Sequence, residues 1–350
     1  MHDALIIGGG PAGLSAAVYL GRFRRRVLVL DEGKGRSSFS QINENYLGFP
    51  DGVSTRELRE LGRKQAERFG AEFADCVVEA IERTEMGFVA RCGDRDYEGL
   101  TVLFATGVCD IWPDIAGIER WIGCGVFWCI TCDGFHAIDK RIVCLGNDDE
   151  AATTALQFLL YTREVTLIVD PGHDRISDLK RAELVKYGVG LVSGHASSIE
   201  ASSDGSSIAA ICLEGGQRLE CDMIFSLLGV TPNTGMAKEL DVTTDEQGYI
   251  EIDDEGYTNV PGVFAAGDLT KMYTQQVASA VHAGAEAAQT MNYYLYASFQ
   301  KNVDDCLPEA TPEEAALVGS AVETLPPEQG GPINVREAAE EDLRNEVATY

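Results

Sequence analysis

Short apolar runs alternate with amphipathic segments over most of this chain. Apolar runs of strand length lie at residues 4–7, 27–30, 100–105, 141–145, 164–169 and 223–228. Segments with helical spacing of their apolar positions lie at about residues 14–22, 56–69, 150–161, 178–187 and 275–296. Strands that alternate with helices in this order are typical of βαβ units, which build parallel sheets covered by helices. The pattern therefore predicts an α/β fold that contains Rossmann-like three-layer units.

Weaker patterns complete the predicted elements. We expect further strands at about residues 71–79, 87–92, 95–98, 190–199, 207–213 and 217–221, and one from 263 to a turn at 267–268. Polar, irregular sequence fills residues 37–55. Connectors that contain proline and glycine, at 112–119 and 229–234, are typical of crossovers between domains.

The first βαβ unit carries a phosphate-binding fingerprint. Gly8, Gly10 and Gly13 form the pattern G-x-G-x-x-G between the first strand and the first helix. The first glycine permits a tight turn, the second lets the backbone approach a pyrophosphate, and the third lets helix and strand pack closely. Asp31 or Glu32 ends the second strand, where a carboxylate can accept hydrogen bonds from ribose hydroxyls. The unit predicts a dinucleotide site, although a merely glycine-rich turn is the simpler alternative.

The second βαβ unit departs from this fingerprint. Gly146 and Ala151 suit the first and third positions, but Asp148 stands where the second glycine is expected. A side chain there would crowd a pyrophosphate, and the acids at residues 148–150 would repel it. Residues 170–173, at the end of the next strand, read Asp-Pro-Gly-His and offer no arginine for a 2′-phosphate. We therefore expect a repeated fold whose own site is disabled for NADPH and for NADH.

Cys129 and Cys132 form the pattern C-x-x-C and are followed by Asp133. This spacing lets a dithiol close to a disulfide and reopen, and so pass two electrons as a unit. A helix N-terminus would favour the thiolate, and the following acid could protonate a leaving thiolate.

Three other interpretations of these cysteines are open. They could form half of a zinc site, a C-x4-C-x2-C iron–sulfur site that adds Cys124 and Cys144, or inert thiols. No second pair has the same spacing, and Cys144 falls in a predicted buried strand. We therefore favour the redox disulfide and expect no metal.

Composition narrows the expected partners and location. The formal net charge of −28 argues against nucleic acid, whose phosphates need a basic surface. No apolar run is long enough to span a bilayer and no signal sequence precedes the first strand, so we expect a cytoplasmic protein that does not bind membranes. Ten cysteines, mostly scattered singly, agree with a reducing compartment. Residues 298–350 are acidic and punctuated by proline, which is typical of a mobile tail that could also wrap the body.

Five motifs together resemble the low-molecular-weight thioredoxin reductases. In chain order they are residues 8–13, 104–107, 129–134 and 266–268, and Gln276. The resemblance covers about residues 3–297. It implies a discontinuous FAD-binding domain formed by residues 1–113 and 242–297, with a smaller disulfide-carrying domain, residues 114–241, inserted in it. It also implies a homodimer in which one domain rotates against the other between half-reactions.

The resemblance implies roles for individual residues. Cys132 resembles the thiol that faces the flavin, Cys129 the thiol that attacks the substrate disulfide, and Asp133 the acid/base. Asp268 resembles the residue that binds the ribityl and phosphate region of FAD, and Gln276 a contact of the flavin ring. The full set expected to contact the dinucleotide is Gly8, Gly10, Pro11, Ala12, Gly13, Asp31, Glu32, Gln41, Asn45, Thr106, Gly107, Gly267, Asp268, Gln275, Gln276 and Val277.

Three departures from the family pattern bear on the electron donor. Asp148 replaces a glycine, His173 stands almost alone where the family has a basic cluster, and Gln275 replaces an arginine. The chain is therefore similar to the pyridine-nucleotide-independent branch, which includes the ferredoxin-linked, deeply rooted and diflavin enzymes. That branch implies electrons from a ferredoxin-type carrier rather than NADPH, and thioredoxin or a similar disulfide protein as acceptor. In that branch the dinucleotide site of the second βαβ unit is either empty or filled by a second FAD. The branch also implies that an aromatic residue of the C-terminal tail, such as Tyr350, stacks on the flavin ring.

Other functions are open for the same residues. An NADPH-dependent thioredoxin reductase would use the same dithiol, and a dithiol oxidase would make small-molecule disulfides and pass electrons to oxygen. A flavin redox sensor would show no multiple turnover. Asp133 favours an enzyme, because a sensor has less need of a proton donor. We therefore expect a flavoprotein disulfide reductase.

Overall fold

The computed structural model describes residues 1–39, 41–272 and 274–298. Met1–Thr290 form one compact unit. The predicted acidic tail beyond residue 298, and with it Tyr350, lies outside the described residues. Within the described part of the chain, every helix is too short or too polar to cross a lipid bilayer.

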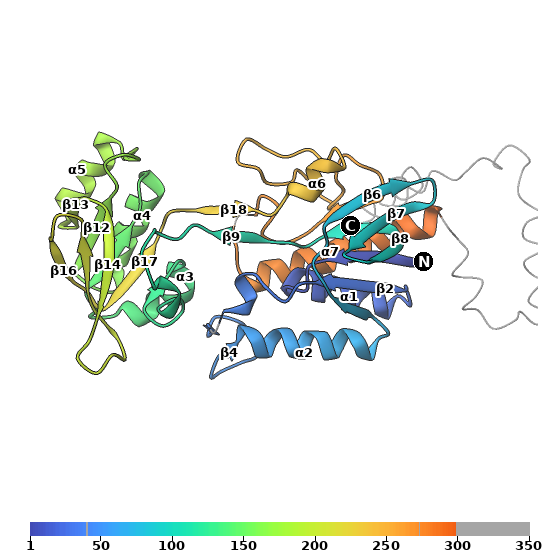
Figure 1. The fold of residues 1–350 in the computed structure, drawn as a ribbon, viewed down its shortest axis with the longest axis horizontal. Helices are drawn as coiled ribbons and strands as arrows, with labels where there is room; N and C mark the ends of the chain where they lie inside the picture. The colour runs from blue at the N-terminus through green and yellow to red at the C-terminus, as the bar shows by residue number, and fades with distance from the viewer. Residues whose placement is uncertain (40, 273, 299–350) are drawn as a thin grey trace, which may run out of the picture. The chain divides into compact units, whose positions relative to one another are not determined.

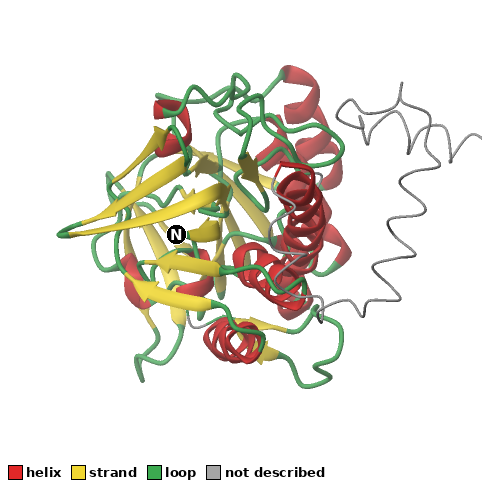
Figure 2. Cartoon of the chain, turned by 90° about the vertical axis from the view of Figure 1, so that its right-hand side faces the viewer, coloured by secondary structure: helices red, strands yellow, loops and turns green. Residues whose placement is uncertain are grey.

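The first sheet contains the first βαβ unit. Its strands, in spatial order, are β5 (Glu72–Asp75), β2 (Val27–Asp31), β1 (His2–Ile7), β8 (Arg95–Phe104), β7 (Gly87–Cys92) and β6 (Ala80–Thr84), with β19 (Val263–Ala265) also paired to β8. β5, β2, β1, β8 and β19 run parallel, whereas β6, β7 and β8 form an antiparallel meander. The helices of this part are α1 (Pro11–Arg22), α2 (Thr55–Arg68), α6 (Gly235–Glu239) and α7 (Val277–Ser298). Helices flank the strands, as Figure 2 shows.

The second sheet contains the second βαβ unit. Its parallel strands, in spatial order, are β10 (Val126–Phe127), β17 (Met223–Ser226), β11 (Ile142–Leu145), β12 (Val165–Val169) and β13 (Gly190–Ser193). An antiparallel sheet of β14 (Ala196–Ala201), β15 (Ile208–Leu213) and β16 (Arg218–Glu220) accompanies it. The helices here are α3 (Ile130–Asp133), α4 (Asp149–Gln157) and α5 (Asp178–Tyr187). Phe158 and Phe225 meet in the core of this sheet, with ring centroids 4.4 Å apart.

The chain leaves the first sheet and returns to it along one narrow ribbon. β9 (Val108–Asp110) pairs antiparallel with β18 (Val230–Pro232), so the outgoing and returning segments lie side by side (Figure 1). β18 falls within the connector predicted at 229–234, and β9 ends just before the one predicted at 112–119. The remaining short elements are β3 (Ile42–Asn43), which pairs with β4 (Val53–Ser54), and the 3-10 helices η1 (Arg36–Ser38), η2 (Ile118–Arg120), η3 (Gly134–Ala137) and η4 (Phe158–Leu160).

The predicted α/β fold is confirmed, and so are both βαβ units, but several boundaries are wrong. α1 begins at Pro11 rather than at residue 14, because a proline at the first helical position lacks only an N–H that would be unpaired anyway. The strand predicted at 190–199 is two strands, β13 and β14, which belong to different sheets. The segments predicted at 95–98 and 100–105 form one strand, β8.

Two glycines allow the helices to approach the phosphate-binding turn. A Cβ on Gly13 would lie 2.0 Å from the carbonyl oxygen of Gly8, so α1 can pack against the end of β1 only with glycine there. A Cβ on Gly284 would lie 2.1 Å from the carbonyl oxygen of Ala12. α7, which is rich in alanine, therefore packs directly on the first turn of α1.

Candidate active site

Cys129 and Cys132 form a disulfide at the start of α3. Sγ of Cys129 caps this short helix by accepting a hydrogen bond from the backbone N–H of Cys132 at 3.1 Å. The same N–H would stabilise a Cys129 thiolate after reduction. Cys124 is exposed and Cys144 is fully buried in β11. Among the described residues, no group of three or more histidine, cysteine or acidic side chains is arranged to hold a metal ion.

The side chain of Gln276, one residue before α7, lies against the disulfide. Its Nε2 donates to Sγ of Cys129 at 3.4 Å, and its Oε1 lies 3.5 Å from Sγ of Cys132. The second contact becomes a hydrogen bond only after reduction, because a disulfide sulfur carries no proton. Nδ2 of Asn45 donates to Oε1 of Gln276 at 3.0 Å. Two of the predicted cofactor residues, Asn45 and Gln276, thus meet each other at the disulfide.

Asp133 is a buried acid beside the disulfide, with only 4% of its surface exposed. Burial raises the pKa of its carboxyl to about 6, and a hydrogen bond from Gln41 opposes this rise. Nε2 of Gln41 contacts both carboxylate oxygens, at 3.2 and 3.0 Å. A carboxyl with this pKa can take up and release a proton near neutral pH. Gln41, a residue predicted to contact the dinucleotide, is therefore hydrogen-bonded to Asp133. It also lines the neighbouring cavity.

A cavity of about 1280 Å³ joins the disulfide to the first βαβ unit. The predicted residues that line it are Gly8, Gly10, Pro11, Ala12, Asp31, Glu32, Gln41, Thr106, Gly107, Gly267, Asp268, Gln275, Gln276 and Val277. Gly13 and Asn45 are not in its wall. A Cβ on Gly10 would meet only Oγ of Ser37, at 3.9 Å, so the N-terminus of α1 opens into free space. Nearly all of the predicted cofactor residues thus face one space.

The two acids at the end of β2 differ in their surroundings. Asp31 forms an ion pair with Arg59, whereas Glu32 is exposed and its one ion pair among the described residues is with Lys34, at 3.6 Å. Glu32 is therefore the freer of the two to accept hydrogen bonds from a ribose. Arg59 carries no sign of this role in the sequence, because it lies on α2, 28 residues from its partner.

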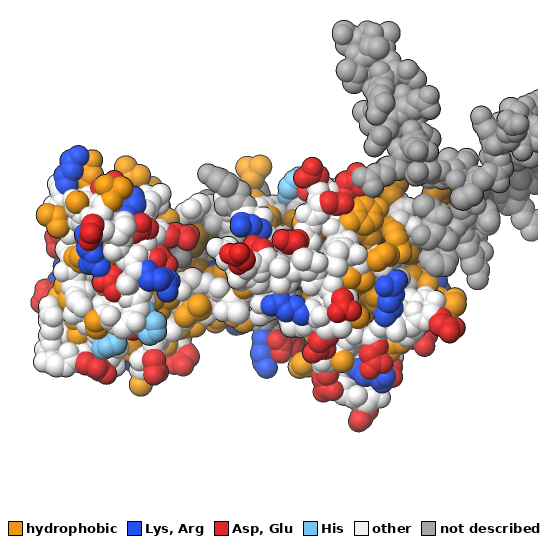
Figure 3. All heavy atoms as spheres, turned by 90° about the horizontal axis from the view of Figure 1, so that it is seen from above, with side chains coloured by type: hydrophobic (Ala, Val, Ile, Leu, Met, Phe, Trp, Pro, Cys, Tyr) orange, Lys and Arg blue, Asp and Glu red, His pale blue; other side chains and the backbone are white. Residues whose placement is uncertain are grey.

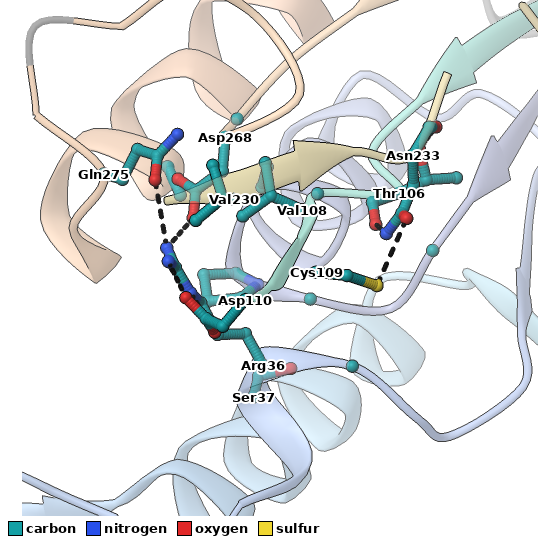
Figure 4. Close-up of a pocket in the computed structure, with 18 of the residues that line it drawn as sticks. Arg36, Ser37, Thr106, Val108, Cys109, Asp110, Val230, Asn233, Asp268 and Gln275 are labelled. Carbon is teal, nitrogen blue, oxygen red and sulfur yellow. Dashed lines mark hydrogen bonds and ion pairs between the residues drawn. The ribbon is translucent and has the colours of Figure 1, made fainter. Parts of the chain in front are cut away.

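Arg36 is a second residue that sequence analysis did not identify, and it joins three polar groups of the cavity (Figure 4). Its Nε donates to Oδ2 of Asp110 at 3.0 Å. Its Nη1 donates to Oδ2 of Asp268 at 3.1 Å and to Oε1 of Gln275 at 3.3 Å. Burial raises the pKa of Asp268 above its usual range, and the Arg36 guanidinium opposes that rise.

Thr106 and Gly107 are held at the end of β8 by one asparagine. Oγ1 of Thr106 donates to the carbonyl oxygen of Asn233 at 2.7 Å, and Nδ2 of Asn233 donates to the carbonyl oxygen of Thr106 at 2.9 Å (Figure 4). This reciprocal pair joins the end of β8 to the residue that follows β18. It fixes the wall of the cavity where the ribbon of β9 and β18 begins.

Asp268 provides a test of whether the cavity suits FAD. Its Oδ1 is buried and has no hydrogen-bond partner among the described residues. A buried carboxylate oxygen without a donor is unfavourable, and a ribityl hydroxyl would supply one. The open N-terminus of α1 would face the pyrophosphate, and Glu32 would face a ribose. The residues present therefore fit a flavin dinucleotide.

In the second βαβ unit, the carboxylate of Asp148 occupies the second glycine position of the fingerprint. Oδ1 of Asp148 caps α4 by accepting from the backbone N–H of Ala151 at 3.0 Å. A Cβ on Gly146 would lie 2.3 Å from that of Ala151, as expected for the first and third positions. The N–H groups that would bind a pyrophosphate therefore already face an anion. The carboxylate of Asp149 accepts from the backbone N–H of Ser177 at 2.7 Å and adds to the negative charge.

The prediction that His173 stands almost alone as a basic residue is wrong. Other basic residues lie close by and are paired with acids. The pairs are Arg175 with Asp148, Arg181 with Asp174, and both His173 and His195 with Asp170. These carboxylates would compete with a 2′-phosphate for the cations.

Comparisons with known proteins show the family of this chain. The family model for pyridine nucleotide-disulphide oxidoreductases matches residues 2–287. The chain belongs to this family. A thioredoxin reductase of Treponema pallidum (strain Nichols) is 33% identical over 306 residues, which cover 84% of this oxidoreductase and 97% of that protein. One from Mycolicibacterium smegmatis is 31% identical over 296 residues, covering 82% and 94%.

A solved structure extends the similarity to the fold. The thioredoxin reductase of Streptococcus pyogenes MGAS5005 matches with a TM-score of 0.79 at 30% identity, over 85% of this chain and 99% of that chain. The oxidoreductase fold described above is thus shared over nearly the whole length of a thioredoxin reductase. The predicted resemblance to the thioredoxin reductases is confirmed at the level of the family.

Proposed function

We propose that this chain is an FAD-dependent disulfide reductase whose electrons come from a ferredoxin-type carrier rather than from NADPH. The electrons would pass through the Cys129–Cys132 dithiol to thioredoxin or a similar disulfide protein. The disulfide reductase class follows from the family and from the relatives named thioredoxin reductase. The observation that carries the proposed donor is the Asp148 carboxylate on the N-terminus of α4.

The residues of the cavity would hold FAD, which supplies the two-electron redox chemistry when bound. Asp268 would accept a hydrogen bond from the ribityl chain, and the N–H groups after Gly10 would bind the pyrophosphate. Arg36 keeps two buried carboxylates, Asp110 and Asp268, in place at this wall. Gln276 contacts both sulfurs and so fixes the disulfide at the same space.

The dithiol chemistry follows from the positions of three side chains. We assign the attack on the substrate to Cys129, because its sulfur receives the backbone N–H that stabilises a thiolate. The Cys129 thiolate forms a mixed disulfide and releases one substrate thiolate, which Asp133 can protonate. Cys132 then attacks Sγ of Cys129 and releases the second substrate thiolate, which takes the proton that Cys132 gives up. The substrate disulfide becomes two thiols, and the Cys129–Cys132 disulfide is formed again.

The choice of donor rests on electrostatics at the second fingerprint. A nicotinamide dinucleotide would have to place its pyrophosphate where the carboxylate of Asp148 lies, beside Asp149 and Glu150. Like charges at this distance repel, and the capping carboxylate has already satisfied the N–H of Ala151. A carrier protein needs no dinucleotide site on this chain. The second site would then be empty. The alternative, a second FAD, would have to bind with its pyrophosphate away from the N-terminus of α4, because the same carboxylate would repel it.

The proposal includes the organisation implied by the resemblance. The FAD domain would comprise residues 1–113 and 242–297, and the disulfide domain residues 114–241. The chain leaves the proposed FAD domain along β9 and returns to it along β18. These two strands pair with each other, which supports the division. We also propose a homodimer, on family resemblance alone, and a cytoplasmic location, on the singly scattered cysteines.

Anaerobic reduction of the bound flavin tests the donor. The protein is mixed in parallel with NADPH, NADH and a reduced ferredoxin, and bleaching of the visible flavin absorption is followed. We expect rapid bleaching with ferredoxin and none above a buffer control with either nucleotide. Dithionite serves as the positive control for a reducible flavin. Rapid bleaching by NADPH, without bleaching by ferredoxin, would make the chain an NADPH-dependent reductase instead.

A further inference from the structure

A second pair of cysteines lies in the first sheet, far in sequence from the C-x-x-C motif. Sγ of Cys76 lies 2.7 Å from Sγ of Cys92, although 16 positions separate the two residues. Cys76 follows β5, and Cys92 ends β7. Sequence analysis gives no sign of this pair, because its spacing matches no motif. Two sulfurs this close can be joined by a disulfide with only a small adjustment of the side chains.

The two cysteines of this pair have different surroundings. Cys92 is 7% exposed and belongs to the core of the first sheet. Cys76 is half-buried and lines the dinucleotide cavity. Its backbone N–H donates to the carbonyl oxygen of Asp31 at 3.0 Å, which fixes it at the ribose end of that cavity. Cys76 is thus the more exposed of the two residues, and Cys92 the more deeply buried.

We propose that Cys76 and Cys92 form a second dithiol–disulfide couple, which small disulfides oxidise through Cys76. Burial raises the pKa of the Cys92 thiol to about 12, and the neighbouring Cys76 adds to that rise. A thiol with this pKa is a weak nucleophile, so the reaction begins at Cys76. This pair is separate from the Cys129–Cys132 disulfide. Cys76 and Cys92 lie at strands of the first sheet, whereas Cys129 and Cys132 lie at the start of α3.

The chemistry balances with a small disulfide as the oxidant. The Cys76 thiolate attacks one sulfur of the small disulfide, forms a mixed disulfide and releases one small thiolate. The small thiolate just released takes the proton of Cys92, and Cys92 attacks Sγ of Cys76, which closes the protein disulfide and releases the second small thiolate. Two protein thiols are oxidised by two electrons, and the small disulfide is reduced to two thiols.

The closed bond would fix part of the cavity wall. Cys76, Val77 and Val78 line the cavity and form the connection between β5 and β6. At present the backbone N–H of Glu79 joins this connection to β7 through the carbonyl oxygen of Arg91, at 2.9 Å. A covalent bond to Cys92 would add a second link between the connection and the meander.

Mass spectrometry tests the couple directly. The full chain with its flavin, carrying Cys129→Ser and Cys132→Ser, is equilibrated with hydroxyethyl disulfide, quenched in acid, alkylated and cut with trypsin. Cleavage after Arg83 and Arg91 separates the two cysteines, so an intact bond joins peptide 69–83 to peptide 92–95. We expect this joined peptide in most molecules. The exposed Cys109 and Cys124 serve as internal controls, which should carry single mercaptoethanol adducts.

Single substitutions test the order of attack. In Cys92→Ser we expect Cys76 to accumulate as a stable mercaptoethanol adduct. In Cys76→Ser we expect Cys92 to stay unmodified under conditions that modify Cys109 fully. The proposal is overturned if the joined peptide is absent while Cys109 is modified. It is also overturned if Cys92 reacts as fast in Cys76→Ser as in the parent.

Discussion

The proton chemistry of the site depends on one carboxyl, that of Asp133. Its pKa is raised to about 6 because it is buried, so its protonated form is lost as the pH rises through that value. Asp133→Asn removes the donor. We expect the single-turnover rate with a small disulfide to fall by about 10²-fold at pH 5 and to change little at pH 8. The ratio of the wild-type rate to the variant rate should be plotted against pH. The ionisation of Cys129 affects both rates equally and therefore cancels in this ratio.

Gln41 tunes that carboxyl without reacting itself. Its amide donates to both oxygens of Asp133 and opposes the rise of the pKa. Gln41→Leu removes this stabilisation of the carboxylate, so we expect the midpoint of the same pH profile to move upward. The profile distinguishes this effect from a structural one, since a loosened fold would lower the rate at every pH. An unchanged midpoint would show that Gln41 has no influence on Asp133.

Arg36 stabilises the wall of the cavity through charge. Its partners Asp110 and Asp268 have side chains only 4% and 17% exposed. Arg36→Ala would leave two neighbouring carboxylates buried without a cation, and we expect it to lower the free energy of unfolding by about 3 kcal/mol in urea at pH 7. Arg63→Ala is the control, because its pairs with Glu67 and Asp75 are exposed and contribute less than about 1 kcal/mol. Equal losses in the two variants would contradict the prediction.

The sequence reveals the reactive residues of the site better than the residues that position them. Cys129, Cys132 and Asp133 lie in one local motif, so they can be found without a structure. Arg36 cannot be found in this way, because its carboxylate partners lie 74 and 232 positions away. The same holds for Cys76 and Cys92, which belong to different elements and are brought together only by the fold of the first sheet.

Among the elements, the contact between α7 and α1 is sensitive to side-chain size. A Cβ on Gly284 would lie 2.1 Å from a backbone oxygen of α1, which neither helix can avoid by a side-chain rotation. We expect Gly284→Ala to lower the free energy of unfolding by about 2 kcal/mol. Gly235→Ala, at the start of α6, is the matched control, since no atom lies within 4 Å of its added Cβ. Urea unfolding of both variants checks the prediction, and a neutral Gly284→Ala would refute it.

Element type could be predicted well, and element boundaries less well. β6 escapes the pattern because its last three residues, Glu82–Thr84, are exposed and polar. β8 is predicted as two pieces because Gly99 interrupts it, yet a Cβ there would lie 2.6 Å from the side chain of Leu5. Glycine at this point serves close packing within a continuous strand. Such contacts depend on a neighbouring strand about a hundred residues away and leave no local signal.

For the molecule as a whole, the repeated βαβ pattern predicts the two sheets, but not the contacts that complete the site. Gln41 reaches Asp133 across 92 positions, and Gln276 reaches Cys129 across 147. On the face drawn in Figure 3, acidic side chains are scattered among basic and apolar ones. With a net charge of −28, any acidic partner must dock through local contacts rather than through the overall field.

The central claim is that the Cys129–Cys132 disulfide exchanges electrons with a flavin in the same molecule. An anaerobic reductive titration of the full chain, compared with the Cys129→Ser, Cys132→Ser double variant, measures this directly. The account predicts that the wild-type chain takes up about two electrons more per molecule than the variant before its flavin is fully bleached. Equal uptake by the two proteins would contradict it.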